Sequence, residues 1–383
     1  MQPAVTLMSP EEMADPSISA ERLLNGPRCT HFTSFDPPFY IVSRYADISD
    51  LLRRPHDFLS GHGQGPNFAP AAGVVSDPPT HTFYRKLVQG DFLPGTISSL
   101  RARMYSLAET MLDQVADQPA WDIHDALAFP LPVTIICDIL GIPTDDIEQF
   151  KLWSDAIGAA LSAQDPTPYE AEQQRMREYL VALLHERRST DDDRLLARIA
   201  RAEQHGVQLT DDEAVGLILQ LFVAGNETTT SLITNFVWRM LANGLWQEFC
   251  AGNLETQQAI TESLRFDPPL LGLFRTTARD LQIGDTPIPA NTKILLHYGA
   301  GNRDPAVFTQ PHVFDVNRPR KNILSFGLGI HVCLGRELAR LEAQAALEVL
   351  ARRFPNLQLE GDGERVAPFL FWGRHKLPVR HTG

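Results

Sequence analysis

A glycine-rich segment that leads directly into a long helical pattern restricts the fold of this chain more than any other stretch. Residues 326–335 read Phe-Gly-Leu-Gly-Ile-His-Val-Cys-Leu-Gly, and a helical pattern follows from Leu334 to Phe354. The glycines allow the backbone to turn tightly and to approach a bulky planar group. Cys333 lies where the unpaired N–H groups and the dipole of the helix stabilise a thiolate. The segment therefore predicts a thiolate presented at the start of a long helix.

A thiolate beside room for a planar group suggests haem iron, because thiolate ligation pushes electron density onto the iron and favours O–O cleavage. The alternative for an isolated cysteine is a small buried hydrophobe. We expect that alternative for Cys29, Cys137 and Cys250, which lie far apart and show no paired spacing. The cysteines therefore indicate a reduced protein without a disulfide framework or a zinc site.

Helical patterns dominate the chain from Thr80 onward, after a loop over Ser60–Pro79 that is long enough to be functional or disordered. Asp211 is expected to cap a long helix that reaches Leu241, with Glu213 in its first turn. Further helices are expected over Ala46–Arg53, Leu100–Val115, Ala128–Leu140, Ile147–Leu161, Tyr169–His185 and Gln257–Phe266, and strands over Pro38–Tyr45 and Leu281–Leu296. These patterns predict a mainly helical chain with a minor β part, in one compact unit.

The cysteine segment resembles the haem-binding signature of the cytochrome P450 family, Phe-x-x-Gly-x-His-x-Cys-x-Gly. The matching residues are Phe326, Gly329, His331, Cys333 and Gly335. Four further motifs occur in the order of that family, so the resemblance extends from about residue 35 to the C-terminus. The resemblance implies an α+β fold, mainly α with small peripheral β-sheets, as a single haem-binding monooxygenase domain over residues 1–383. It also implies haem b, held between a long distal helix and the helix after Cys333, and O2 as co-substrate.

An acid and a threonine interrupt an apolar helical run at Ala224–Thr229 (AGNETT). A mid-helix glycine costs about 1 kcal/mol relative to alanine, and a threonine can bond back to the i−4 carbonyl and open the helix locally. By resemblance, Thr228 holds the bound oxygen species and its water, and Glu227 supplies protons from solvent. The chain has Glu where many relatives have Asp. The alternative is a kinked core helix with a solvated Glu.

A second group of residues resembles the cationic side chains with which the family binds the haem propionates. His81 and Arg85 are four residues apart and therefore share a helix face. Arginine binds carboxylates bidentately, and the resemblance assigns the same duty to Arg275 and His331. The alternative for each is an ordinary surface cation.

Glu262 and Arg265 match the Glu-x-x-Arg motif of the family, and Arg318 matches the third member of that triad. The i, i+3 spacing allows the first two side chains to pair on one helix face. We expect the triad to support folding around the cysteine loop, without a catalytic role.

The substrate pocket is assigned by resemblance to the loop before the His81 helix, the distal helix, the segment after Glu-x-x-Arg and a C-terminal turn. Its expected residues are Phe68, Val74, Val75, Gln220, Leu221, Ala224, Leu270, Leu271, Leu273, Phe369, Leu370, Phe371 and Trp372. No cation is among them, which favours a neutral hydrophobic substrate such as a terpenoid or an aromatic. Gln220 is the obvious polar anchor. The alternative is that several of these residues pack the core.

The formal net charge of −13 argues against a nucleic-acid or anionic-membrane partner. The chain shows no signal peptide and no apolar run of the ~18 residues that a membrane span needs, so we expect a cytoplasmic monomer. No reductase portion is found; electrons are expected from a separate ferredoxin-type protein with an NAD(P)H-linked reductase. Lys86, Arg336 and Arg340 are candidate docking residues. Two alternatives stay open, a peroxide-driven peroxygenase and a non-catalytic haem-binding sensor or carrier.

Overall fold

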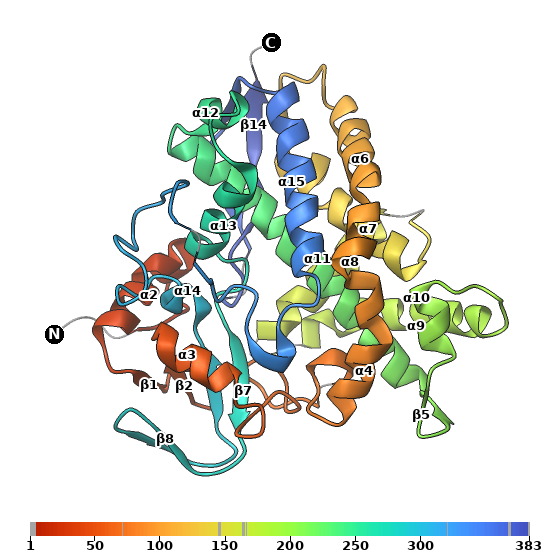
Figure 1. The fold of residues 1–383 in the computed structure, drawn as a ribbon, viewed down its shortest axis with the longest axis vertical. Coiled ribbons are helices and arrows are strands. Elements are labelled where there is room, and N and C mark those ends of the chain that lie inside the picture. Colours follow the sequence, from red (N-terminus) through yellow and green to blue (C-terminus); the bar gives the residue numbers. More distant parts are fainter. Residues whose placement is uncertain are drawn as a thin grey trace. The chain divides into compact units, whose positions relative to one another are not determined.

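The computed structural model describes residues 5–70, 72–144, 147–162, 165, 167–319, 321–366 and 369–381 (Figure 1). The chain divides into two compact units, each built from separate stretches of sequence. The strand-rich unit comprises Met1–Ala71, Leu254–Cys333 and Arg365–Gly373. The helix-rich unit comprises Ala72–Asn253, Leu334–Glu364 and Arg374–Gly383.

The strand-rich unit is organised around a five-stranded sheet with the order β1-β2-β10-β7-β3. Its strands are β1 (Cys29–Phe32), β2 (Phe39–Val42), β3 (Phe58–Leu59), β7 (Leu273–Thr277) and β10 (Lys293–Leu296), and β8 (Leu281–Ile283) pairs with β9 (Thr286–Ile288) in a separate hairpin. Its helices are α1 (Pro10–Ala14), α2 (Pro16–Asn25), α3 (Tyr45–Leu52), α13 (Thr256–Phe266), α14 (Tyr298–Gly301) and the 3₁₀ turn η5 (Gly329–His331).

Two apolar clusters hold this sheet. One contains Phe39, Phe274 and Phe369, and the other contains Ile294 and Leu324. All residues of β10 and nearly all of β7 are buried, which is typical of central strands covered on both faces. The sheet therefore gives rigid support to the residues that β7 carries.

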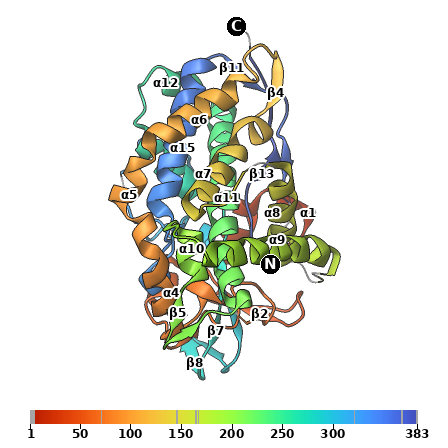
Figure 2. The same cartoon turned by 90° about the vertical axis from the view of Figure 1, so that its right-hand side faces the viewer.

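The helix-rich unit is built around α11, which packs against α7, α8 and α15 (Figure 2). Its α-helices are α4 (Thr80–Val88), α5 (Pro94–Ser99), α6 (Arg101–Asp113), α7 (Pro130–Leu140), α8 (Ile147–Ser162), α9 (Glu170–Arg188), α10 (Leu195–Ala200), α11 (Asp211–Ala242), α12 (Trp246–Cys250) and α15 (Arg336–Arg353). Short helical turns are η1 (Gly73–Val75), η2 (Gln89–Phe92), the π-turn η3 (His124–Ala128) and η4 (Thr167–Tyr169).

Short strands complete the molecule. In the helix-rich unit, β4 (Ala120–Asp122), β11 (Leu357–Leu359) and β14 (Pro378–His381) form a sheet with the order β11-β14-β4. β5 (Glu203–Gln204) pairs with β6 (Val207–Gln208). The remaining strands are β12 (Glu364–Arg365) and β13 (Arg374–Lys376). The expected fold class, mainly α with small sheets, is confirmed.

The length of α11 follows from its N-terminal cap. Thr210, not the expected Asp211, is the N-cap residue, and it forms a reciprocal capping box with Glu213. The Thr210 N–H donates to Glu213 Oε2 over 2.9 Å. Asp211 instead accepts hydrogen bonds from His185 and Arg188 of α9. The expected cap was wrong by one residue because the hydroxyl before the acid satisfies the first turn.

Most expected helices lie within a few residues of their predicted bounds. The strand expected over Pro38–Tyr45 is shorter, because Tyr45 begins α3, where its N–H donates to the Asp304 carboxylate over 2.9 Å. The helices α1 and α2 were not predicted; each begins with a proline after a capping Ser9 or Asp15. In the part of the chain that the structure describes, no helix combines the length and apolarity needed to cross a membrane.

Candidate active site

The cysteine loop of the strand-rich unit is shaped by its own backbone. The Cys333 N–H donates to the Phe326 carbonyl over 2.8 Å, which closes the loop. Gly327 and Gly329 have φ values of +62° and +74°, in the left-handed region that favours glycine. A Cβ at Gly329 would lie 2.3 Å from the Leu52 carbonyl oxygen. The glycines are therefore required for the backbone path that carries Cys333.

The four cysteines differ in their surroundings. Burial raises the pKa of the Cys29 and Cys137 thiols to about 12 and that of the Cys250 thiol to about 11. Cys333 is exposed, whereas Cys29 and Cys137 are buried and Cys250 is half-buried. An exposed thiol on a glycine-shaped loop fits the ligand that a haem iron requires, and the three others do not.

Arg275 lies on β7, opposite Ile294 of β10, and is 3% exposed. Its Nη1 donates to the Phe274 carbonyl over 2.8 Å. Lys293, also buried, was missed by the sequence reasoning: its Nζ donates to the carbonyls of His62 and Gly63, over 2.8 Å each. Burial, followed by the charge of Arg275, lowers the pKa of Lys293 to about 8. The sheet therefore presents a second buried cation beside the expected one.

The expected folding triad lies inside the strand-rich unit. Arg265 Nη2 and Nε donate to the two carboxylate oxygens of Glu262 over 2.7 and 2.8 Å. Arg318 Nε donates to the same carboxylate over 3.1 Å, and the Asp315 N–H donates over 2.9 Å. The side chains of Glu262 and Arg265 are 3% and 1% exposed. The structure thus brings Glu262, Arg265 and Arg318 together, as the motif predicts.

The pocket segments of the strand-rich unit pair through their backbones. The Leu271 N–H donates to the Leu370 carbonyl over 2.8 Å, and Leu270 forms an isolated β-bridge with Phe371. Phe369, Leu370 and Phe371 belong to a buried core cluster, whereas Leu270, Leu271 and Leu273 are half-buried. Phe68 is 50% exposed, and its ring lies 5.0 Å from Lys293 Nζ.

In the helix-rich unit, α4 carries His81, which is buried, and Arg85, which is half-buried, one turn apart. Val74 and Val75 lie on η1, and Gln220, Leu221 and Ala224 lie on α11. The Gln220 Nε2 donates to the Ala72 carbonyl over 2.5 Å. A Cβ at Gly73, whose φ is +61°, would lie 2.4 Å from Gln220 Oε1. The expected polar anchor therefore binds the chain segment before η1 with its amide N–H.

The glycine and the threonine that interrupt the apolar pattern of α11 are accommodated without a break in the helix. The Thr228 hydroxyl donates to the Ala224 carbonyl, four residues earlier, over 2.7 Å. A Cβ at Gly225 would lie 3.1 Å from two atoms of Ile136 on α7, so the glycine permits the close packing of the two helices. The helix is continuous from Asp211 to Ala242.

Glu227 is half-buried and accepts a hydrogen bond from Ser154 of α8 over 2.6 Å. Burial raises its pKa to about 7, against the opposing effect of this hydrogen bond. A carboxyl group with such a pKa holds and releases a proton near neutral pH, as general acid–base chemistry requires. Ser154 was missed by the sequence reasoning; its signal is the polar set Lys151, Ser154 and Asp155 at helical spacing in an otherwise apolar helix.

A second buried acid, Glu342 of α15, was also missed. Burial raises its pKa well above the usual value, and the Thr229 side chain of α11 lowers it to a smaller extent. Glu342 is fully buried, which favours its neutral form.

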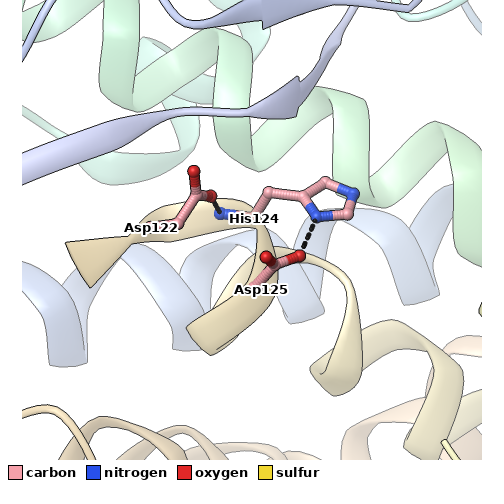
Figure 3. Close-up of side chains that lie close together, drawn as sticks. All are labelled: Asp122, His124 and Asp125. Atoms are coloured by element: carbon pink, nitrogen blue, oxygen red, sulfur yellow. Dashed lines mark hydrogen bonds and ion pairs between the residues drawn. The ribbon is translucent and has the colours of Figure 1, made fainter. Parts of the chain in front are cut away.

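Asp122, His124 and Asp125 gather where β4 runs into η3 (Figure 3). The Asp125 carboxylate lies 2.8 Å from His124 Nδ1 and 2.6 Å from Lys151 Nζ. These two contacts hold the pKa of Asp125 far below its usual value. Asp122 accepts the backbone N–H groups of His124 and Leu377. The carboxylates are thus engaged by protein donors, and the cluster joins β4, η3 and α8.

The family model for cytochrome P450 matches residues 254–369. Cytochrome P450 107B1 of Saccharopolyspora erythraea is 33% identical over 364 residues, which cover 89% of each chain. Erythromycin C-12 hydroxylase of the same organism is 36% identical over 352 residues, 88% of each chain.

Solved structures agree with these relatives. Ligand-free CYP164A2 of Mycobacterium smegmatis has a TM-score of 0.90 and 34% identity, and the match covers 98% of each chain. A mutant of P450 EryK in complex with erythromycin B has a TM-score of 0.87 and 31% identity, with 97% of this chain and 98% of that chain covered. The similarity in sequence extends over most of the chain. The chain belongs to the cytochrome P450 family of haem-containing monooxygenases.

Proposed function

We propose that this cytochrome P450 hydroxylates a neutral hydrophobic substrate with Cys333 as the iron ligand and with Glu227 and Thr228 as the residues that manage protons. The overall change is R–H + O2 + 2e⁻ + 2H⁺ → R–OH + H2O. When bound, haem supplies the redox centre at which O2 is reduced. Cys333 would hold its iron, and Phe326, Gly329 and Gly335 would shape the loop beneath it. His81, Arg85, Arg275 and His331 would hold its propionates.

The observation that carries this proposal is the acid–threonine pair of α11. Water formation consumes two protons, and an apolar pocket cannot supply them. Glu227 has a pKa of about 7 and can exchange protons at neutral pH. Thr228 presents its hydroxyl oxygen as an acceptor, because its proton is directed to the Ala224 carbonyl. A peroxygenase or a haem carrier has no need of this arrangement.

The substrate class follows from the expected pocket residues, which are apolar apart from Gln220. The Lys293 ammonium donates to two backbone carbonyls. It therefore does not change the expected preference for a neutral compound. We propose a terpenoid- or aromatic-like hydrophobe. Relatives named erythromycin C-12 hydroxylase and 6-deoxyerythronolide B hydroxylase make macrolides the second class to test.

We further propose that residues 1–383 act as one haem domain, monomeric and cytoplasmic, with electrons from a separate ferredoxin-type donor. Lys86 and Arg336 are exposed and Arg340 is half-buried on the helix-rich unit. These cations suit the acidic surface of such a donor. Neutralising Lys86 and Arg336 together should slow reduction by the donor and weaken its dependence on ionic strength.

The test compares Thr228→Ala with the matched control Thr234→Ala. Thr234 lies on the same helix and also bonds back to the i−4 carbonyl, over 3.1 Å. A substrate is first found by a spin-state titration with terpenoids, aromatics, fatty acids, steroids and macrolides. Thr228→Ala should then bind haem and substrate normally but yield peroxide in place of product for most of the NAD(P)H consumed. Equal coupling in both variants would contradict the proton-handling role, and turnover supported equally by peroxide would favour the peroxygenase.

A further inference from the structure

A buried polar chain links α8 and α11 and ends on the carboxyl group of Glu227. Ser154 Oγ donates to Glu227 Oε1 over 2.6 Å, and Asn226 Nδ2 donates to Ser154 Oγ over 2.8 Å. Thr230 Oγ1 lies 3.2 Å from Asn226 Oδ1 and 3.0 Å from the Ala128 carbonyl. Ser154 and Asn226 are both 0% exposed. Hydrogen bonds of this kind are costly to leave unmade in such a buried place.

The direction of these hydrogen bonds determines whether they can conduct protons to Glu227. Because Asn226 donates to the Ser154 oxygen, the Ser154 proton is aimed at Glu227. An amide does not exchange its protons at neutral pH on the timescale of turnover, so the chain ends at Asn226 as a path for protons. The Asn226–Ser154 pair therefore orients the Glu227 carboxyl group and does not conduct protons to it.

We propose that Ser154, held by Asn226, is a positioning residue that orients the Glu227 carboxyl group and sets the pH range over which Glu227 releases its proton. This inference rests on the proposed function of Glu227. The hydrogen bond favours the carboxylate form, and burial favours the neutral form. Their balance places the pKa of Glu227 at about 7.

The charged groups around Glu227 contribute less than burial and the Ser154 hydrogen bond. Asp155, adjacent to Ser154 on α8, raises the pKa of Glu227, and Lys151, one turn earlier, lowers it. Lys151 is bound to the Asp125 carboxylate. Figure 3 shows that this carboxylate also contacts His124. The pKa of Asp155 is itself raised by burial, against Lys151, His124 and His375. Among the described residues, the Ser154 hydroxyl is therefore the side chain that donates to the Glu227 carboxyl group.

The experiment follows the carboxyl C=O stretch of Glu227 by infrared spectroscopy of the holoenzyme across pH, with Glu227→Gln to assign the band. In Ser154→Ala the Glu227 carboxylate loses a hydrogen bond. Loss of a hydrogen bond to a charged group raises the pKa of a carboxyl group by about one unit or more. The Glu227 titration should therefore move upward by about one pH unit in Ser154→Ala. Ser154→Thr keeps the hydroxyl and should titrate close to the wild type. Ser231→Ala removes a buried serine of α11 that, within the described part of the chain, forms no hydrogen bond with Glu227, and it should leave the band in place.

Activity gives the second readout. The alkaline limb of the pH profile of coupled product formation should move upward with the infrared titration in Ser154→Ala and return in Ser154→Thr. An unshifted Glu227 band in folded, haem-loaded Ser154→Ala would overturn the inference. A shifted band with an unchanged pH profile would overturn the catalytic use of Glu227 and leave the Ser154 contact standing, so the two failures are distinguishable.

Discussion

Two acidic side chains, Glu262 of the strand-rich unit and Glu227 of the helix-rich unit, have very different hydrogen-bond partners. Glu262 is 3% exposed and receives donors from two guanidinium groups and a backbone N–H. Glu227 is half-buried and receives one serine hydroxyl. Glu262 therefore has two positively charged partners. Glu227 has a neutral donor, and its pKa is about 7.

We propose that this difference lets one residue type perform two tasks, one in support of the fold and one in proton exchange. A carboxylate with several charge-assisted hydrogen bonds joins chain segments, here α13 and the stretch around Arg318. A carboxyl group with burial and a single neutral donor stays near the point of proton exchange. We propose that the partners of a buried acid separate a supporting residue from a proton-handling one.

The largest effect is expected from Glu262→Gln. The substitution leaves the buried Arg265 and the nearby Arg318 without their carboxylate, which costs about 3–5 kcal/mol of unfolding free energy. Urea unfolding should show this loss against Glu21→Gln, an exposed matched control on α2 with an expected change within about 0.5 kcal/mol. A loss below about 1 kcal/mol would mean that the triad does not support the fold.

The second effect is a pH dependence of stability that Glu227 introduces. Its pKa is 4.5 when exposed and about 7 in the fold, so between these values the native state binds more protons than the unfolded state. Stability from this group is therefore present at low pH and is lost as the pH rises, by about 2–3 kcal/mol between about pH 5 and pH 7. The difference in unfolding free energy between wild type and Glu227→Gln should fall by that amount. A flat difference would contradict the raised pKa.

A smaller effect is expected from Arg318→Lys. Lysine keeps the charge near Glu262 but loses the fork with which Arg318 also reaches the carbonyls of Gln310 and Val313. We expect a loss of about 1–2 kcal/mol in urea unfolding, well below that of Glu262→Gln. An equal loss in both variants would show that the charge contributes little and that the geometry of the fork dominates.

The smallest effect is expected from Glu342→Gln. Glu342 is fully buried and burial raises its pKa well above the usual value, so the neutral amide replaces a group whose neutral form is favoured. We expect less than about 1 kcal/mol of change, although the same substitution at Glu262 is severe. A loss above about 2 kcal/mol would show that Glu342 is ionised and has a partner of opposite charge.

The sequence predicts these groups unequally. Glu262, Arg265 and Arg318, like the loop around Cys333, are set by short motifs whose spacing survives into the structure. Long helices are predicted well because their apolar spacing is periodic. Ser154 and Lys293 escape prediction because their partners are far away in the sequence, at Glu227 and at the carbonyls of His62 and Gly63. Periodicity says that a polar residue is out of place but not which distant atom satisfies it.

The cysteines, like the two acids, differ in their surroundings. Burial holds Cys29 and Cys137 as neutral thiols, with pKa values of about 12, while Cys333 is exposed on a loop that only glycines can form. Environment, more than residue type, again decides which member of a set has a chemical role.

The most direct test of the account is the absorption spectrum of the reduced, carbon monoxide-bound protein after loading with haem. The wild type and the control Cys250→Ser should both show the red-shifted Soret band of a haem thiolate. Cys333→Ser should lose that band. Retention of the band in Cys333→Ser, or its loss in Cys250→Ser alone, would contradict the assignment of Cys333 as the iron ligand.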